Sequence, residues 1–200
     1  LFLDKEDVSI SRAKVLFSQK KKGIFPSIVD KIYKDRVKIK KQLNKVKRQR
    51  VDDADNPELK LKAEQLHILQ LTLKILINRV YGYFGNKNSP MGDPDIARSI
   101  TLTGQAVIKH ANSILNNFVS KKIGVEDSKL VSPVLYNDTD SVYITLKPLI
   151  EHLNIPFLKG KKVSPEIKEL VQEIEDVLNK GVKEWSEKSL NSKDSRFVFK

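Results

Sequence analysis

The stretch Val134-Leu-Tyr-Asn-Asp-Thr-Asp-Ser-Val-Tyr-Ile144 joins two short apolar runs through a polar turn. The runs, residues 134–136 and 142–146, flank four polar residues at 137–140, and this pattern predicts a β-hairpin. In the second run apolar and polar side chains alternate, as in a strand with one buried face. The positions predicted to share that buried face are Val142, Ile144 and Leu146.

The predicted turn carries two carboxylates, Asp138 and Asp140, which are two residues apart. Like charges this close repel each other unless a cation neutralises them. Oxygen ligands at this spacing suit Mg²⁺, which shares its coordination sphere with waters and with substrate phosphates. Asp is also a common turn residue because it hydrogen-bonds nearby backbone, so an isolated pair of this kind is usually turn chemistry. These residues alone leave both interpretations open.

Positive charge is concentrated near the start of the chain. The 200 residues carry a net charge of +12, from 37 Lys and Arg against 25 Asp and Glu. Residues 12–50 hold fifteen of the basic residues and two Asp, so the rest of the chain is nearly neutral. Such a block is typical of a surface that meets phosphate-rich partners, and a solvated lysine-rich helix face is the common alternative.

Composition narrows the class of protein. Hydrophobic residues make up 40% of the chain, which is enough for a globular core. No apolar run reaches the roughly 18 residues of a membrane-spanning helix, so we expect no membrane partner. A signal peptide is not evident, and the absence of Cys fits a reducing compartment. The first residue is Leu1 rather than Met, which predicts a fragment or an incomplete reading frame.

The first third of the chain predicts a short strand pair at residues 8–19 and then a long helix. Pro26 suits the first helical turn, where its missing N–H is not needed. Arg36 and Lys40 are one turn apart and share one face of this helix. Its apolar positions at helical spacing are Ile28, Ile32, Ile39, Leu43 and Val46.

A second helix is predicted from Glu58 to Phe84, after a polar connector at 51–57. At about 100° per residue, a cation, an amide and an aromatic ring project within an arc of about 60°, away from the apolar stripe. These three residues are Lys74, Asn78 and Tyr81, and the stripe consists of Leu66, Leu69, Leu73, Leu76 and Val80. Gly82 and Gly85 are predicted to close the helix. The pair forms an antiparallel helical hairpin, for which a plain solvated polar face is the alternative.

The remainder predicts two more helices around the β-hairpin. Asp93 caps the first, which is expected to end near Val119 and to be followed by a loop at 121–129. Ser164 begins the second, and residues 196–199 predict a final strand. The positions expected to be buried are Ile96, Ile100, Val107, Ile114 and Phe118 in the first helix and Ile167, Leu170, Val171, Ile174, Leu178 and Trp185 in the second. The predicted fold class is α+β, with a long helical hairpin attached to an antiparallel β-hairpin packed on helices.

Three motifs resemble those of the family B DNA polymerases. Tyr136-Asn-Asp-Thr-Asp-Ser141 resembles motif C, with Asn137 in place of the usual Gly. Lys74-Ile-Leu-Ile-Asn-Arg-Val-Tyr-Gly82 resembles motif B, with Arg79 in place of the usual Ser, and Lys22-Gly-Ile-Phe-Pro26 resembles the lead-in to the fingers. The resemblance covers essentially the whole chain, and within the family it is greatest to the replicative polymerases of T-even-like bacteriophages.

This resemblance implies a domain organisation. Residues 1–25 would be the strands that lead in from the palm, residues 26–84 the fingers hairpin, and residues 85–200 a partial palm with motif C. Asn is the residue other than Gly that best accepts a positive φ, so the motif C turn is expected to tolerate Asn137.

The resemblance also implies site residues. In the family, the positions of Asp138 and Asp140 serve two Mg²⁺ ions, with that of Asp140 a direct ligand. Arg36, Lys40 and Lys74 match the cations that contact the triphosphate of the incoming dNTP.

Three further residues complete the implied nucleotide site. The position of Asn78 orients the triphosphate or the sugar. Those of Tyr81 and Gly82 line the floor against the nascent base pair.

Motif A of the family, Asp-x-x-Ser-Leu-Tyr-Pro-Ser, does not occur in this sequence. We therefore expect the C-terminal-half fragment of a DNA polymerase, inactive alone, whose partner is an N-terminal segment with motif A and the exonuclease. Its other expected partners are primer-template DNA, dNTP and a sliding clamp reached through a missing C-terminus. A phage-encoded chain of this kind would act in the cytoplasm of the infected bacterial host.

Two other classes of function stay open. The basic block alone would serve a non-enzymatic helical module that binds nucleic acid. The changes at Asn137 and Arg79 would fit a non-catalytic, nucleic-acid-binding polymerase-like subunit.

Overall fold

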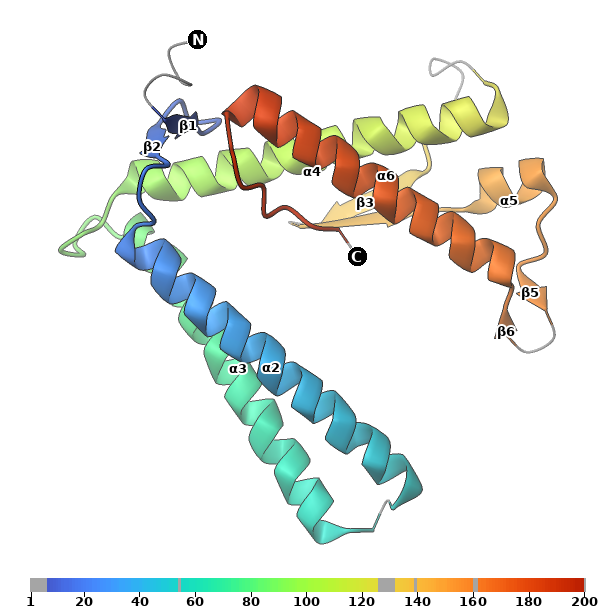
Figure 1. The fold of residues 1–200 in the computed structure, drawn as a ribbon, viewed down its shortest axis with the longest axis horizontal. Helices are drawn as coiled ribbons and strands as arrows, with labels where there is room; N and C mark the ends of the chain where they lie inside the picture. Colours follow the sequence, from blue (N-terminus) through green and yellow to red (C-terminus); the bar gives the residue numbers. More distant parts are fainter. Residues whose placement is uncertain (1–6, 54, 126–131, 139, 160–161, 200) are drawn as a thin grey trace. The chain divides into compact units, whose positions relative to one another are not determined.

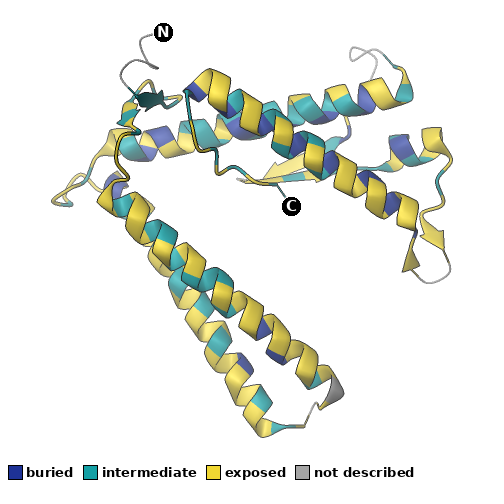
Figure 2. Cartoon of the chain, in the orientation of Figure 1, coloured by how far each residue is buried: buried dark blue, intermediate teal, exposed yellow. Residues whose placement is uncertain are grey.

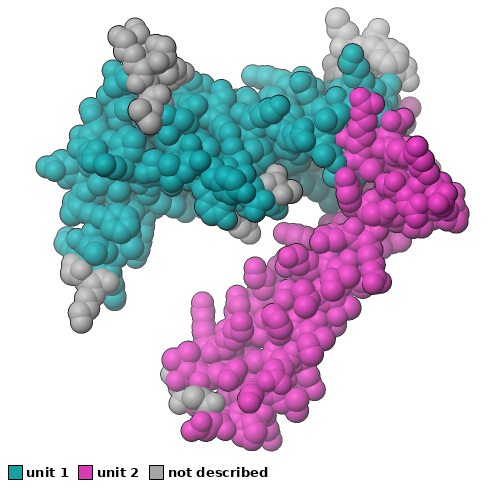
Figure 3. Space-filling model, turned by 180° about the vertical axis from the view of Figure 1, so that it is seen from behind, with its two compact units in different colours: residues 1–19, 99–200 teal, residues 20–98 magenta. Residues whose placement is uncertain are grey.

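The structure is a computed structural model that describes residues 7–53, 55–125, 132–138, 140–159 and 162–199. Figure 1 shows long helices accompanied by short antiparallel β-hairpins, which confirms the α+β fold class. The chain divides into two compact units (Figure 3), and each is described by itself. Unit 1 consists of residues 1–19 and 99–200, and unit 2 of residues 20–98.

The described helices are α2 (Ile24–Asp52), α3 (Pro57–Gly85), α4 (Pro94–Ile123), α5 (Lys147–Leu153) and α6 (Pro165–Leu190). The strands pair as three antiparallel hairpins. They are β1 (Val8–Ile10) with β2 (Leu16–Ser18), β3 (Val134–Asp138) with β4 (Ser141–Ile144), and β5 (Leu158–Lys159) with β6 (Lys162–Val163). The strand pair predicted within residues 8–19 is therefore confirmed.

Unit 2 is dominated by the helical hairpin of α2 and α3. Asn56 caps α3 by accepting hydrogen bonds from the backbone N–H groups of Glu58 and Leu59. Near the open end, the ring of Phe25 packs on that of Phe84, with 4.7 Å between centroids. Farther along, a small cluster of buried side chains joins the helices: Leu43, Val46 and Ala63.

The buried seam of this hairpin is narrower than the sequence pattern indicated. Leu69 and Leu76 were expected in the stripe of α3, but they are 44% and 40% exposed, and Ile28 of α2 is 44% exposed. Two helices that pack only on each other bury one narrow stripe each, which leaves the flanking apolar positions in solvent. Figure 2 shows this as two helices that are mostly exposed.

Unit 1 has the larger core, which lies between α4 and α6. The two helices run antiparallel: His110 stacks on Trp185 with 5.5 Å between centroids, and Lys122 pairs with Glu173 at 3.0 Å. Helix α5 adds Leu149, which is 1% exposed. The buried core residues of the two long helices are Val107, Ala111, Leu115, Val119, Leu170, Ile174, Leu178 and Val182.

The β3–β4 hairpin packs its inner face on this core. The residues that do so are Val134, Val142 and Ile144, and Leu146, which follows β4, packs on the same core. Pairing of Val134 with Ile144 and of Tyr136 with Tyr143 leaves Leu135 as an extra residue, which forms a β-bulge. Within β4 the predicted alternation is confirmed, since Tyr143 is exposed, but the strand ends at Ile144, two residues before the end of the predicted run.

Several details of the predicted helices in unit 1 were wrong. Helix α4 continues to Ile123, so the loop expected from residue 121 starts later. Ile100 and Val171 are exposed, at 52% and 45%, and neither belongs to the buried core of unit 1. Ile100 precedes Val107, the first residue of α4 in that core. The predicted burial of Ile167, Leu170, Ile174 and Leu178 is confirmed.

The final strand predicted at residues 196–199 is not a strand among the described residues. The side chain of Asn179 takes the place of a neighbouring strand for Phe199. Its Nδ2 donates to the carbonyl oxygen of Phe199 at 3.0 Å, and its Oδ1 accepts from the N–H of Phe199 at 2.8 Å. An alternating apolar sequence therefore lies on the core without a β-ladder.

Within the described residues, none of the helices is sufficiently long and apolar to cross a membrane.

Candidate functional site

The two candidate carboxylates lie at the tip of the β3–β4 hairpin. Asp138 is the last residue of β3 and pairs with Ser141, and Asp140 lies in the turn directly before β4. The backbone N–H of Asp140 donates to the carbonyl oxygen of Asp138 at 2.5 Å, which closes the turn. Both Asp residues are exposed. The hairpin therefore presents two carboxylates to solvent from a base that is packed on the core.

This turn is tighter than the sequence pattern indicated. The expected turn comprised residues 137–140, but the ladder continues through Asn137, which pairs with Val142. Asn137 has no positive φ, so the reason given for its tolerance in place of Gly was wrong. Thr139 lies outside the described residues. A residue inside a β-ladder does not need the freedom of Gly, so Asn137 fits its position.

The register fixes the direction of Asp138. Side chains alternate along a strand, so Asp138 shares the outer face with Tyr136, and Tyr143 lies on that face of β4. The rings of Tyr136 and Tyr143 are tilted against each other, with 5.8 Å between centroids. An aromatic pair on the outer face thus adjoins the acidic tip.

The carboxylates fit part of a Mg²⁺ coordination sphere. Two exposed carboxylates next to each other offer the hard oxygen ligands that this ion prefers. Within the described residues, no group of three or more His, Cys, Asp or Glu side chains could hold a metal ion. Asp138 and Asp140 can therefore supply some of the ligands, and other ligands must come from substrate phosphates, waters or another segment.

The cationic candidates lie on the helical hairpin of unit 2. At about 100° per residue, Arg36 and Lys40 lie roughly 50° to 90° to one side of the buried seam of α2. In α3, the rotation about the helix axis from the buried seam to Lys74, Asn78 and Tyr81 is roughly 50° to 110°. It has the same sense as the rotation from the seam of α2 to Arg36 and Lys40. In an antiparallel helix pair these two sides face the same way. The five residues therefore share one face of the hairpin, which we call the nucleotide face after the role that the family resemblance implies for them.

The positions of these residues along the axis of the hairpin agree with this grouping. Phe25 packs on Phe84 at one end, and Leu43 lies in the cluster with Ala63 farther along. Because the helices are antiparallel, Arg36 lies at the level of Lys74 and not near the tip. Lys74, Asn78 and Tyr81 are exposed, as predicted.

Arg36 has a feature that suits an anion. Its side chain is half-buried, and its Nε is buried without a hydrogen-bond partner among the described residues. A buried donor that is left unpaired raises the free energy of the folded state. If the side chain turned outward, Nε could donate to a phosphate oxygen.

Gly82 lies inside α3 and does not close it, since the helix ends at Gly85.

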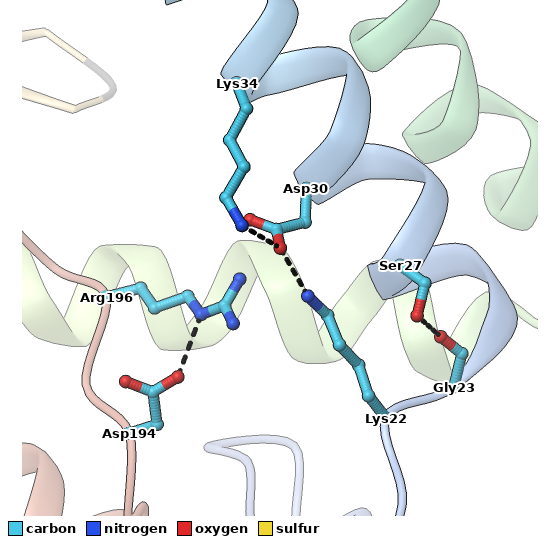
Figure 4. A network of polar contacts seen from close by, with 7 residues as sticks. All are labelled: Lys22, Gly23, Ser27, Asp30, Lys34, Asp194 and Arg196. Carbon is cyan, nitrogen blue, oxygen red and sulfur yellow. Dashed lines mark hydrogen bonds and ion pairs between the residues drawn. The ribbon is translucent and has the colours of Figure 1, made fainter.

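The acidic residue nearest the start of α2 is engaged with other cations. Figure 4 shows Asp30 between two amines, that of Lys22 at 2.5 Å and that of Lys34 at 3.1 Å. The hydrogen bond from Lys22, followed by that from Lys34, lowers the pKa of Asp30 from 3.8 to about 2. Neither Arg36 nor Lys40 belongs to this group, so their charges are not offset there.

One further cation on the nucleotide face escaped the sequence prediction. Lys47 follows Lys40 by seven residues, or about two helical turns, so it lies on the same side of α2 and is exposed. The spacing of two turns was the signal that could have identified it.

Comparisons with known proteins give the chain relatives along most of its length. It matches the model of DNA polymerase family B over residues 3–179. A DNA polymerase of Trichoplusia ni ascovirus 2c is 31% identical over 140 residues, which are 70% of this chain and 11% of the relative. The DNA polymerase delta catalytic subunit of Plasmodium falciparum is 33% identical over 125 residues, 62% of this chain and 10% of that protein.

A phage protein is similar to the same degree. The DNA-directed DNA polymerase of Enterobacteria phage T4 is 31% identical over 123 residues, 55% of this chain and 13% of that protein. The likeness to T-even-like phages is therefore modest, because viral and eukaryotic relatives match equally well. The chain spans between 10% and 13% of the length of these three relatives.

Proposed function

Because the chain belongs to DNA polymerase family B, we propose that it forms part of a template-directed DNA polymerase that transfers nucleotides from dNTP to a primer 3′-hydroxyl. The observation that carries this proposal is the β3–β4 hairpin, which is anchored on a buried core and bears Asp138 and Asp140 at its exposed tip. A rigid base with adjacent carboxylates is what metal-assisted phosphoryl transfer requires.

The two carboxylates have related roles in this proposal. Asp140 is a direct ligand of Mg²⁺, and Asp138 supports the same two-ion site. When bound, the ions supply positive charge at the reacting phosphate. The primer 3′-hydroxyl forms its bond to the α-phosphorus while the bond to pyrophosphate breaks, and the hydroxyl proton passes to solvent.

The nucleotide face receives the incoming dNTP. Arg36, Lys40 and Lys74 contact the triphosphate, where Arg can bind two oxygens at once and Lys acts as a point charge. Lys74 can also donate a proton to the leaving pyrophosphate. The unpaired Nε of Arg36 supports this role.

The remaining candidates orient the nucleotide. Asn78 positions the triphosphate or sugar, and Tyr81 with Gly82 lines the floor under the new base pair. Open space around Gly82 supports this, since apart from its chain neighbours and the backbone of α3 itself, no heavy atom lies within 4 Å of a Cβ added there.

Catalysis needs a further polymerase segment that carries motif A. The sequence has no such motif, and two metal ions need more carboxylates than the hairpin provides. The assembled enzyme binds primer-template DNA, and a sliding clamp is a further partner of the longer protein. The viral relatives support replication inside a host cell, which for a phage-encoded chain is the bacterial cytoplasm.

Primer extension tests the proposal. The chain is combined with a family B segment that carries motif A, and incorporation of one nucleotide is measured with Mg²⁺. Asp140→Asn is expected to lower the rate by about a hundredfold or more, because charge neutralisation at the reacting phosphate is lost. Asp176→Asn is the matched control, since this exposed Asp of α6 lies in the same unit.

Equal rates for Asp140→Asn and the control would contradict the catalytic role. Unchanged DNA binding together with no Mg²⁺-dependent incorporation by the assembled wild-type chain would instead favour a non-catalytic, nucleic-acid-binding subunit.

The nucleotide face has a separate test in the same assay. Lys74→Ala is expected to raise the KM for dNTP by about tenfold or more, because a charged hydrogen bond to phosphate is lost. Affinity for primer-template should stay near the wild-type value. Lys109→Ala, an exposed site on α4, serves as the control.

A further inference from the structure

Helix α2 carries a second row of cations that the proposed nucleotide site does not use. Its members recur at alternating spacings of three and four residues: Lys31, Lys34, Lys38, Lys41, Lys45 and Arg48. All six are exposed. By helical angle the row points away from the buried seam, on the side opposite to Arg36 and Lys40. We call it the outer row.

The two halves of the outer row differ in charge balance. Lys34 pairs with Asp30 at 3.1 Å, and Lys38 approaches Asp35 at 3.7 Å. In the half nearer the tip of the hairpin, the residues Lys41, Lys45 and Arg48 form no ion pair within the described part of the chain. Within the described part of the outer row, the charges of these three residues are therefore not offset by ion pairs.

A shallow hollow lies within this tip half. Its volume is about 400 Å³, and it is lined by Lys41, Asn44, Lys45, Arg48 and Gln49. The lining thus combines three cations with two amides that can donate hydrogen bonds, and it contains no carboxylate. Donors of this kind without an acid among them fit phosphate oxygens.

We propose that the hollow and the outer row bind the sugar-phosphate backbone of single-stranded DNA, without preference for base sequence. Six cations along one straight helix span roughly 26 Å, with one about every 5 Å. A repeating row matches a polymer with repeating charge better than a single anion. The hollow contains no aromatic ring on which a base could stack, so affinity comes from charge alone.

Shape favours a single strand over a duplex. The row as a whole follows the convex surface of one helix, and the hollow is an open gap between side chains of that helix. A flexible strand can follow such a surface along the row. Duplex DNA has a persistence length of about 50 nm, so it stays straight over this distance. Each of its strands winds around the duplex axis, so a strand that touches the row would turn away from it after a few phosphates. This site goes beyond the proposed function, because it requires neither Asp140 nor a nucleotide.

Binding of the whole 200-residue chain to a labelled oligo(dT) of about 20 nucleotides tests the inference. Fluorescence anisotropy gives the dissociation constant at several salt concentrations. The triple variant Lys41→Gln, Lys45→Gln, Arg48→Gln removes three contacts, so the salt slope should fall by about 2, at about 0.7 per phosphate for a single strand. Affinity near 0.1 M salt should fall by about tenfold or more.

A control variant carries the same loss of net charge. Lys168→Gln, Lys180→Gln and Lys183→Gln change three exposed lysines of α6, and they should leave the slope nearly unchanged. Far-UV circular dichroism checks the helix content of each variant. If the triple variant loses helix, the single variant Lys45→Gln is measured, for which the slope should fall by about 0.7.

Three results would overturn the inference. The first is an equal loss of affinity in the α6 control, which would mean that net charge alone governs binding. The second is equal or tighter binding of a duplex of the same length. The third is displacement of oligo(dT) by poly-glutamate at the same charge concentration, which would assign the hollow to acidic peptides. Loss of catalysis in Asp140→Asn with unchanged oligo(dT) binding keeps this site separate from the polymerase site.

Discussion

The two units contain helices of similar length but bury them to different extents. Helices α2 and α3 have 29 residues each, while α4 and α6 have 30 and 26. Nevertheless the buried cluster of unit 2 comprises three residues, whereas that of unit 1 comprises nine and includes a third helix. The proposed metal carboxylates lie on the well-packed unit, and the proposed phosphate-binding cations lie on the thin one.

The difference follows from what each group must do. Metal ligands need fixed positions, and the core under the β3–β4 hairpin provides them. Long cationic side chains on an exposed hairpin can reach a flexible anion without a rigid surround. The stability of unit 1 should therefore depend on its core and that of unit 2 on local helix interactions.

The largest expected effect is in the core of unit 1. Leu115 is 1% exposed, so Leu115→Ala should lower the free energy of unfolding by about 2–5 kcal/mol through lost burial and a cavity. Urea unfolding followed by the fluorescence of Trp185, the one Trp of the sequence, reports on this unit.

The matched change in unit 2 is Leu43→Ala, at a residue that is 4% exposed. In this variant the helix signal of the hairpin should be lost at a lower urea concentration than in the wild type. The free energy of unfolding should fall by about 2 kcal/mol, near the low end of the range for such changes, because the thin seam can collapse around the cavity. The Trp185 transition should not move. An equal shift of the Trp185 transition in both variants would contradict the contrast.

A pair of glycines sharpens the comparison. A Cβ added at Gly181 of α6 would lie 2.6 Å from Cδ1 of Ile114 in α4, so Gly181→Ala should destabilise unit 1 by about 1–2 kcal/mol. At Gly82 of α3 an added Cβ would meet no atom within 4 Å beyond its chain neighbours and the helix's own backbone, so Gly82→Ala should stabilise the hairpin by about 0.5–1 kcal/mol. Thermal unfolding measures both, and equal signs would count against the packing described.

Helix caps should matter equally in the two units, since capping is local. Asn56 caps α3, and Ser164 caps α6 by accepting from the N–H of Ile167 at 3.3 Å. Asn56→Ala and Ser164→Ala should each lower stability by about 1 kcal/mol. A much larger effect of Ser164→Ala in urea unfolding would show that its burial, and not the cap, dominates.

The smallest expected effect concerns acid. The pKa of Asp30 is about 2 in the folded chain against 3.8 ordinarily, so its ion pairs stabilise unit 2 fully above about pH 4 and are lost as the pH falls toward 2. Asp30→Asn should make the helix signal of the hairpin less sensitive to pH in this window. Circular dichroism between pH 5 and about 2 measures this, and an unchanged pH profile would contradict the ion-pair assignment.

Local pattern predicted most of the fold. The spacing of Leu43 and Val46, the cap at Ser164 and the alternation through Val142 and Ile144 all gave elements that the structure confirms. These features act between neighbours in the chain, so the sequence states them directly.

Features that depend on distant neighbours could not be predicted in this way. The side chain of Asn179 replaces a strand partner for Phe199, and no local pattern announces that contact. The depth of burial at Leu69 was misjudged because periodicity does not show how many partners cover a face. At the candidate site, the sequence identified Asp138 and Asp140, whereas the two-residue turn between the strands followed from register.

The central claim is that Asp140 binds the catalytic metal, and a metal switch tests it most directly. The sequence has no Cys, so Asp140→Cys introduces a unique thiol in place of the carboxylate. A thiolate is a poor ligand for Mg²⁺ and a good one for a softer ion. In the assembled polymerase, the account predicts that Asp140→Cys loses incorporation with Mg²⁺ and regains it with Cd²⁺, while Asp176→Cys behaves as wild type. Full activity with Mg²⁺, or no recovery with Cd²⁺, would contradict it.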